Sequence, residues 1–411
     1  MKIAVVGAGI VGAAIALRLA LQEQDVCLYE RTEPGSGTSY GNAGHIGAAS
    51  IVPWANASNR RNALKWLRDD LHPLRMPMSG IPGKAKWIGR WLSASRDNRA
   101  ERGTNALADL LRDLNEDLAP LVEASKAGPL ISRKGLLHVF ADPSAFAVAS
   151  AGFELRRHYG IRFEELAPEE LKEMEPALAS KNLRAIFLPD VAQVHDPEGL
   201  VKTYVEAFVG MGGKLVREEV AGISQVDADA VELCAKGQER FDWVVLAAGL
   251  QSEDLARDLG VSVPLWAERG YHRQFNHGAD LLSRSVLFVD SRVVLSPMAR
   301  GLRLTTGAEF TAHDAPPLHD AMLPIFRAAQ AALPEMPDPA EGEPWVGSRP
   351  STPDSLAIIG HAPKADRVIL AYGHGHSGIT QSAATSRIVA NLVRRQAPHL
   401  DLAPFSPPRG W

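Results

Sequence analysis

Residues 2–30 read KIAVVGAGIVGAAIALRLALQEQDVCLYE, an apolar run that is interrupted by three glycines and ends at an acidic residue. Lys2–Val6 is typical of a buried strand, residues 10–21 of a helix rich in Ala and Leu, and Asp25–Tyr29 of a second strand. The glycines form a G-x-G-x-x-G pattern between the first strand and the helix. The segment therefore predicts a strand, a glycine turn, a helix and a second strand.

This turn is suited to a dinucleotide. Gly7 permits the tight turn, Gly9 lets a pyrophosphate approach the backbone, and Gly12 lets the helix pack closely on the strand. The helix amino terminus offers unpaired N–H groups to phosphate oxygens. Glu30 is placed to accept hydrogen bonds from a ribose diol, and its charge disfavours the 2′-phosphate of NADP, so FAD and NAD remain. The predicted contacts in this segment are Gly7, Gly9, Ile10, Val11, Gly12, Glu30 and Arg31.

Three later segments favour FAD over NAD. Residues 35–46, GSGTSYGNAGHI, form a polar loop of small residues that can pass close to a flat ring. Residues 241–249, FDWVVLAAG, predict a late buried strand of the same domain. Residues 367–372 predict another strand, followed by the turn GHGHSG at 373–378 and a helix to about residue 395. This second turn at a helix amino terminus predicts a second site for electron-rich cofactor atoms.

Five motifs in the same order carry a family resemblance. They are the first glycine motif with Glu30, TSYGNAGHI at 38–46, VLAAG at 245–249, GSRPSTPD at 347–354 and GHGHSGIT at 373–380. Together they resemble the FAD-dependent D-amino acid oxidase superfamily, above all its bacterial D-amino acid dehydrogenase branch, in which a similar loop is followed by Pro-Trp, here Pro53 and Trp54.

The resemblance spans residues 1 to about 395 and implies noncovalent FAD, because neither Cys27 nor Cys234 falls where relatives attach flavin. It implies cofactor contacts, beyond those of the first segment, at Thr38, Ser39, Asn42, Ala43, Gly44, Ile46, Val220, Ala248, Gly249, Gly373, Gly375, Gly378, Ile379 and Thr380.

The expected fold is α/β, with a discontinuous FAD-binding Rossmann-like domain of the glutathione reductase type and a substrate domain built on a mixed or antiparallel sheet. We expect the FAD-binding domain at 1–80, 195–260 and 345–411, and the substrate domain at 81–194 and 261–344. Leucines at helical spacing from Leu107 to Leu121 predict a core helix. Strands of the substrate domain are predicted at 270–275, 285–296 and 301–309.

Flavin oxidation of an amino acid requires mainly that the protein orient the substrate. Arg349 matches the family's substrate-carboxylate arginine, whose planar fork binds a carboxylate bidentately. Tyr271 resembles the family's active-site tyrosine, whose hydroxyl bonds the same carboxylate; a tyrosine that only packs is the alternative. His376 and His45 are candidates to contact the substrate or to accept its proton near neutral pH, or else are polar loop residues.

The resemblance implies oxidative deamination of a D-amino acid to the 2-oxo acid and ammonia, by hydride transfer to flavin N5, with quinone or oxygen as electron acceptor. One alternative is oxidation of a cyclic or N-substituted amino acid, such as D-proline or hydroxy-D-proline. Another is a flavin-carrying subunit of a larger complex without catalysis of its own.

The composition narrows the class of protein. The 44 Lys and Arg against 48 Asp and Glu give a net charge of −4, which argues against nucleic-acid binding. Two cysteines exclude a disulfide framework or a structural zinc site and indicate a reducing, cytoplasmic compartment; we expect no metal.

Residues 60–102 depart from this average, with 11 basic and four acidic residues. Four of the eight tryptophans lie in or beside this segment: Trp54, Trp66, Trp87 and Trp91. The pattern predicts either a lid over the substrate pocket with its indoles turned inward, or peripheral contact of residues 54–102 with the inner face of the cell membrane, where quinone is found.

Overall fold

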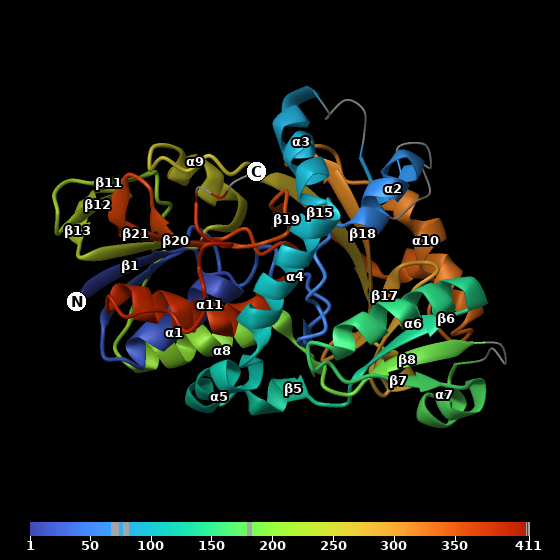
Figure 1. The fold of residues 1–411 in the computed structure, drawn as a ribbon. Helices are drawn as coiled ribbons and strands as arrows, with labels where there is room; N and C mark the ends of the chain where they lie inside the picture. Colours follow the sequence, from blue (N-terminus) through green and yellow to red (C-terminus); the bar gives the residue numbers. More distant parts are fainter. Residues whose placement is uncertain (67–73, 77–81, 179–182, 408, 410–411) are drawn as a thin grey trace.

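The structure is a computed structural model that describes residues 1–66, 74–76, 82–178, 183–407 and 409. Two large β-sheets lie side by side, and the chain passes between them repeatedly (Figure 1). The strands of the first sheet are β1 (Lys2–Val6), β2 (Asp25–Tyr29), β10 (Lys214–Val216), β14 (Trp243–Leu246), β20 (Ile358–Ala362) and β21 (Ala365–Tyr372). Their order is β10-β2-β1-β14-β21-β20, and all pairs are parallel except β20 with β21.

Side chains of β1 alternate between two cores on the two faces of this sheet. Ile3 and Val5 pack against helices α1 (Ile10–Ala20), α8 (Pro197–Gly210) and α11 (Gly378–Val393). Ala4 and Val6 pack against a three-stranded antiparallel sheet and helix α9. These elements are β11 (Gly222–Gln225), β12 (Val231–Cys234), β13 (Gln238–Phe241) and α9 (Ser252–Arg257). The layers confirm the expected α/β nucleotide-binding domain.

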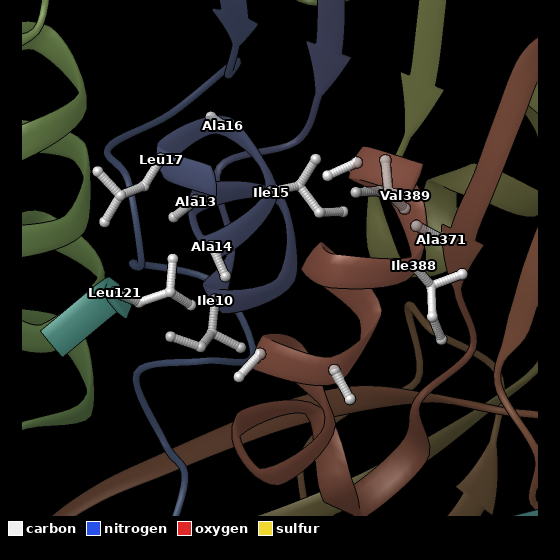
Figure 2. Packing of buried hydrophobic residues seen from close by; sticks show 14 of the residues in the cluster. Ile10, Ala13, Ala14, Ile15, Ala16, Leu17, Leu121, Ala371, Ile388 and Val389 are labelled. Carbon is white, nitrogen blue, oxygen red and sulfur yellow. The ribbon is translucent and has the colours of Figure 1, made fainter. Parts of the chain in front are cut away.

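Helix α1 is rich in small residues, and most of its residues are buried. Figure 2 shows Ile15 directed toward Val389 of α11, and Ile10 beside Leu121. A Cβ added to Gly12 would lie 1.8 Å from the carbonyl oxygen of Gly7, so any other residue would force the helix away from the turn. Helix α1 can therefore lie close to the first glycine turn because Gly12, the third glycine of the motif, has no side chain.

Helices α4 (Asp97–Leu111) and α5 (Leu114–Ser125) pack into the same core as α1 and α11. The predicted core helix is thus two helices, and its leucines are all buried: Leu107, Leu110, Leu111, Leu114, Leu118 and Leu121. Buried Asp117 of α5 also pairs with Arg387 of α11, with Oδ1 and Nη1 3.0 Å apart. Residues 97–125 therefore pack with the FAD-binding domain rather than with the expected substrate domain, since their buried leucines lie in the same core as α1 and α11.

The second sheet is mixed, as expected. Its strands are β4 (Leu74–Arg75), β6 (Leu136–Phe140), β7 (Glu164–Leu166), β8 (Arg184–Leu188), β15 (Trp266–Gln274), β16 (Ser285–Phe288), β17 (Val293–Met298), β18 (Gly301–Thr311) and β19 (Glu343–Ser351). The order is β19-β15-β18-β17-β16-β6-β8-β7, with β4 paired to β18. The strand predicted at 285–296 is a hairpin of two strands, and β19 extends past the expected domain boundary at residue 345 because it pairs along all of β15.

One face of this sheet is covered by α10 (Leu323–Ala328) and α7 (Pro168–Met174), and α6 (Pro143–Arg157) packs over part of the other. A small third sheet, made of β3 (His45–Ile46), β9 (Ala192–Val194) and β5 (Ile131–Ser132), lies between the two halves. It fixes the loop that follows the first βαβ unit.

The tryptophan-bearing segment covers the second sheet through α2 (Ala57–Trp66) and α3 (Ala85–Ala94). Trp87 and Trp91 are buried, and the Trp54 ring lies 5.0 Å from that of Phe310 in β18. Residues 67–73 and 77–81, including Arg68, Asp69 and Asp70, and the side chain of Trp66 lie outside the described residues. The inward packing of the three described indoles supports a lid; membrane contact is not shown.

Among the described residues, no helix combines the length and apolar character needed to cross a bilayer.

The placement of α4 leads to a stability prediction. Leu110→Ala removes a side chain with 0% exposure, so the free energy of unfolding should fall by about 2–5 kcal/mol. Leu155→Ala on α6 is the control, because Leu155 is 56% exposed and its loss should change stability by no more than about 0.5 kcal/mol. Urea unfolding followed by circular dichroism and by flavin release should shift together for Leu110→Ala; an unchanged flavin-release midpoint would contradict the assignment of α4 to the FAD-binding core.

Candidate functional site

A long cavity runs through the FAD-binding domain, and we call it the glycine-lined cavity. It begins beside the first glycine turn, passes the loop at 35–42, and ends at the second glycine turn. Most of the predicted cofactor residues line it: Gly7, Gly9, Ile10, Val11, Glu30, Arg31, Thr38, Ser39, Asn42, Val220, Ala248, Gly249, Gly373, Gly375, Gly378 and Ile379. Five segments that are far apart in sequence therefore meet along one cavity.

The first turn is held open for a ligand by two side chains. Glu30 accepts a hydrogen bond from the backbone N–H of Ala8 (Oε2 to N, 2.8 Å), and Ser39 Oγ accepts one from Ile10 (3.0 Å). A Cβ added to Gly9 would meet only Ser39 Oγ, at 3.3 Å, so the backbone at Gly9 is open toward the cavity. The turn thus presents the uncovered backbone of Gly9 to the cavity at a helix amino terminus, which is an environment suited to a pyrophosphate.

Several other residues that line this cavity were not predicted from the sequence. Glu218, Glu219 and Gln251 line its end beside Val220, and Arg31 pairs with Glu219 at 3.4 Å. His313 and Ser348 line it from the second sheet. The adjacency of Glu218 and Glu219 to Val220 could have identified that end, whereas nothing local marks His313, which comes from the loop after β18.

The remaining predicted cofactor residues hold the loop rather than line the cavity. Gly44 donates its N–H to Oδ1 of the cavity-lining Asn42 (2.8 Å), Ala43 O accepts from Ser296 Oγ (3.2 Å), and Thr380 Oγ1 donates to the carbonyl of His45 (3.0 Å). Ile46 is buried in the core of α1 and α11, and Gly12 packs against the turn. The loop is therefore anchored both to the second sheet and to α11.

Arg349 lies where the two sheets meet. Its Nη1 donates to Glu268 Oε1 and to the carbonyl of Gly307, each at 3.0 Å. Glu268 is buried, and it also accepts from Ser351 Oγ (2.6 Å) and contacts His376 Nε2 (2.7 Å). The carboxylate of Glu268 thus joins β15, β19 and the second glycine turn, and we call these four residues the Glu268 cluster.

The rest of the Arg349 guanidinium remains available. Within the described part of the chain, its Nε and Nη2 donate no hydrogen bond, and its side chain is 17% exposed. Gly270 makes room for it, because a Cβ there would lie 2.0 Å from Nη2. Ser348, the residue before Arg349, lines the glycine-lined cavity and accepts from Thr38 Oγ1 at 2.7 Å. Arg349 can therefore bind an anion next to the cofactor cavity.

The three histidines differ in environment. The His376 side chain is 46% exposed; Glu268 raises its pKa, but the desolvation by the surrounding protein and the Arg349 cation outweigh Glu268, so the pKa lies below the usual 6.5. Burial lowers the pKa of His45 to about 4, and that of His374, which contacts Thr385 Oγ1, also to about 4. All three rings are neutral at pH 7. Among the described residues, His376 contacts Glu268, whereas His45 does not.

The structure does not bring Tyr271 together with Arg349, which corrects that expectation. Neighbouring residues of a strand point to opposite faces, and Glu268 and Gly270 share the face of Arg349. Tyr271 points to the other face, where it is buried and its hydroxyl donates to Glu309 and accepts from the N–H of Leu318. Burial and the bond to Glu309 raise its pKa to about 12. The packing alternative describes Tyr271.

The comparisons with known proteins agree with this geometry. The family model described as "DAO: FAD dependent oxidoreductase" matches residues 2–392. The chain is 31% identical to a D-amino-acid oxidase of Bradyrhizobium diazoefficiens, over 99% of this chain and 98% of that protein. It is 32% identical to a D-amino acid dehydrogenase of Paramagnetospirillum magneticum, over 96% of this chain and 95% of that protein.

Among solved structures, the glycine oxidase of Geobacillus kaustophilus superposes with a TM-score of 0.75, at 24% identity, over 100% of this chain and 99% of that one. This likeness confirms the fold, and the family match confirms both the resemblance found in the sequence and FAD as the cofactor. The chain therefore belongs to the DAO family of FAD-dependent oxidoreductases and is an amino acid oxidase or dehydrogenase by family.

Proposed function

We propose that this enzyme oxidises D-amino acids to 2-oxo acids and ammonia, with Arg349 as the residue that binds the substrate carboxylate. The observation that carries the proposal is the hydrogen bonding of Arg349 beside the cofactor cavity. Nη1 makes two hydrogen bonds, whereas Nε and Nη2 make none among the described residues. Two parallel donors on one planar group match the two oxygens of a carboxylate.

FAD, when bound, supplies the acceptor for the α-hydrogen and its electron pair, which leaves an imine that water hydrolyses. The residues of this chain supply orientation. Glu268 and the Gly307 carbonyl fix one edge of the guanidinium, so that the free edge keeps a single direction. Ser351 and His376 satisfy the remaining Glu268 lone pairs, which lowers the cost of burying that carboxylate.

His376 is a group that can exchange a proton with a substrate held by Arg349, because both side chains contact Glu268 Oε1. Its lowered pKa keeps the imidazole neutral at pH 7, so it is able to accept the proton of a substrate ammonium group. We assign it this role and assign none to His45, which lies in β3.

Two of the relatives that match along their full lengths are named D-amino-acid oxidase and D-amino acid dehydrogenase, which supports a D-amino acid as substrate. Quinone or oxygen remains the proposed electron acceptor. The tryptophan lid over the second sheet supports a site that is shielded from bulk water once substrate is bound.

Anaerobic titration of the purified flavoprotein tests the function. Matched D- and L-amino acids and cyclic amino acids such as D-proline should be compared by bleaching of the oxidised flavin. We expect D-amino acids to bleach it at least ten times faster than their L-forms. Faster bleaching by D-proline would favour a cyclic substrate, and no bleaching by any amino acid would contradict the proposal. Readmitting oxygen or adding a quinone then identifies the acceptor.

Arg349→Lys keeps the positive charge beside Glu268 but removes the planar fork. Losing one charge-assisted hydrogen bond costs about 1.5–3 kcal/mol, so kcat/KM should fall about 10- to 100-fold, mainly through KM. FAD content should not change, because Arg349 does not line the glycine-lined cavity. Arg327→Lys is the control, since Arg327 is an exposed residue paired with Asp338. An unchanged KM in Arg349→Lys would remove Arg349 from the site.

The pH profile tests His376. With neutral His376 as proton acceptor, kcat/KM should be level near neutral pH and fall as the pH drops through the pKa of His376, below 6.5. In His376→Gln, kcat/KM should instead rise until the substrate amine loses its own proton. Exposed His361→Gln should keep the wild-type profile. Identical profiles for wild type and His376→Gln would show that His376 takes no proton.

A further inference from the structure

A second cavity adjoins the Glu268 cluster and shares Gly373, His374 and Gly375 of the second glycine turn with the glycine-lined cavity. Its volume is about 390 Å³, and two of its walls are the indoles of Trp54 and Trp87. Glu268 and His376, which contact Arg349, also line it. We call it the tryptophan-lined cavity. A substrate bound through its carboxylate to Arg349 has this space within reach of its side chain.

Arg156 carries the unmatched charge in this cavity. It lies near the end of α6 and lines the cavity, and its guanidinium lies over the ring of Phe153, with Cζ 4.7 Å from the centroid. Its Nε donates to the carbonyl of Ala49 (3.3 Å) and its Nη1 to that of Gly152 (3.1 Å). Among the described residues no carboxylate pairs with it, and its Nη2 has no acceptor.

The other charged residue on the wall is already neutralised. Glu268 is matched by Arg349 at 3.0 Å, and Ser351 and His376 take its remaining acceptor sites. Burial lowers the pKa of Arg156 with no opposing negative group, as expected for a cation without a partner. Burying part of a guanidinium without a counter-ion carries an unfavourable desolvation free energy, and an anion bound in the cavity would offset it.

Gln381 is a second polar group without a partner. It lies in the first turns of α11, is 2% exposed, and lines the same cavity. Its Oε1 has no hydrogen-bond partner in the described structure. Because the oxygen and nitrogen of an amide exchange places by a half-turn, Gln381 can present its Nε2 donors to an anion. The cavity is therefore lined by one guanidinium nitrogen, Arg156 Nη2, and one buried amide oxygen, Gln381 Oε1, that have no hydrogen-bond partner among the described residues.

We propose that the tryptophan-lined cavity receives the substrate side chain and selects side chains that end in a carboxylate, with Arg156 and Gln381 as the groups that bind it. The preferred substrates are then acidic D-amino acids, aspartate or glutamate, which carry one carboxylate to Arg349 and the other to Arg156. This inference rests on the proposed function, since Arg349 must hold the α-carboxylate.

The wild-type enzyme provides the first test, with two matched pairs: D-glutamate against D-glutamine, and D-aspartate against D-asparagine. Acid and amide have nearly the same shape, so the ratio of their kcat/KM values isolates the charge. A charge-assisted hydrogen bond predicts a ratio of about 10 to 100 in favour of the acid in at least one pair. Amides that react as well as the acids in both pairs overturn the proposal, whatever the variants do.

The variants test Arg156 itself. Arg156→Met keeps the apolar stem and should bring the acid-to-amide ratio to about 1, whereas Arg156→Lys should keep part of it. The FAD content and the absorption spectrum of both variants should match those of the wild type, and this reports an intact flavin site. Arg157→Met is the matched control, because Arg157 is the next residue on α6, is exposed, and pairs with Glu154. An acid-to-amide ratio that survives in Arg156→Met overturns the role of Arg156.

Failure of this inference and failure of the proposed function give different results. If no amino acid bleaches the flavin, the proposed function fails. If D-alanine and D-glutamine bleach it and D-glutamate does so no faster, the enzyme is a D-amino acid oxidoreductase and only the acidic preference is wrong.

Discussion

The buried carboxylate of Glu268 ties the two halves of the molecule together at the point where chemistry is proposed. It receives Arg349 and Ser351 from β19 and His376 from the turn that opens α11. A carboxylate in this position is tolerable only because its acceptor sites are filled from both sheets. Displacing one sheet against the other would break the contact between Glu268 and His376, although Arg349, which lies in the same sheet as Glu268, would stay paired with it. The relative position of the cofactor domain and the substrate sheet is therefore held by this polar contact as well as by apolar packing.

Glycines also allow close packing on both sides of this boundary. Gly12 lets α1 approach the first turn, and Gly270 leaves room for the guanidinium of Arg349. The loop at 42–46 is then bound to both halves, through Ser296 of β17 and Thr380 of α11. Ligand-binding groups that belong to different domains are in this way held at a common boundary, where a flavin and an amino acid can meet.

The unusual charge of residues 60–102 acquires a structural explanation in its described part. Lys84 Nζ donates to the carbonyl of Leu265 and Arg90 Nη1 to that of Ser262, while Trp87 Nε1 donates to the carbonyl of Ser351. Cationic side chains thus fasten α3 to the segment that leads into β15, and Trp87 of α3 lines the tryptophan-lined cavity. The local excess of basic residues therefore contributes to the lid, and the overall net charge carries no information about it.

The sequence by itself determined the first βαβ unit, the two glycine turns, the family and the identity of Arg349, because these depend on local backbone geometry and on residue types in order. It placed Tyr271 beside Arg349, it assigned 97–125 to the substrate domain although their leucines pack with α1 and α11, and it put a domain boundary at residue 345, inside β19. Each of these depends on strand register or on which apolar faces meet, which no local pattern encodes. Only the tertiary structure put Glu268 between Arg349 and His376, and Arg156 and Gln381 on one cavity, since these side chains come from separate segments of the chain that no local pattern connects.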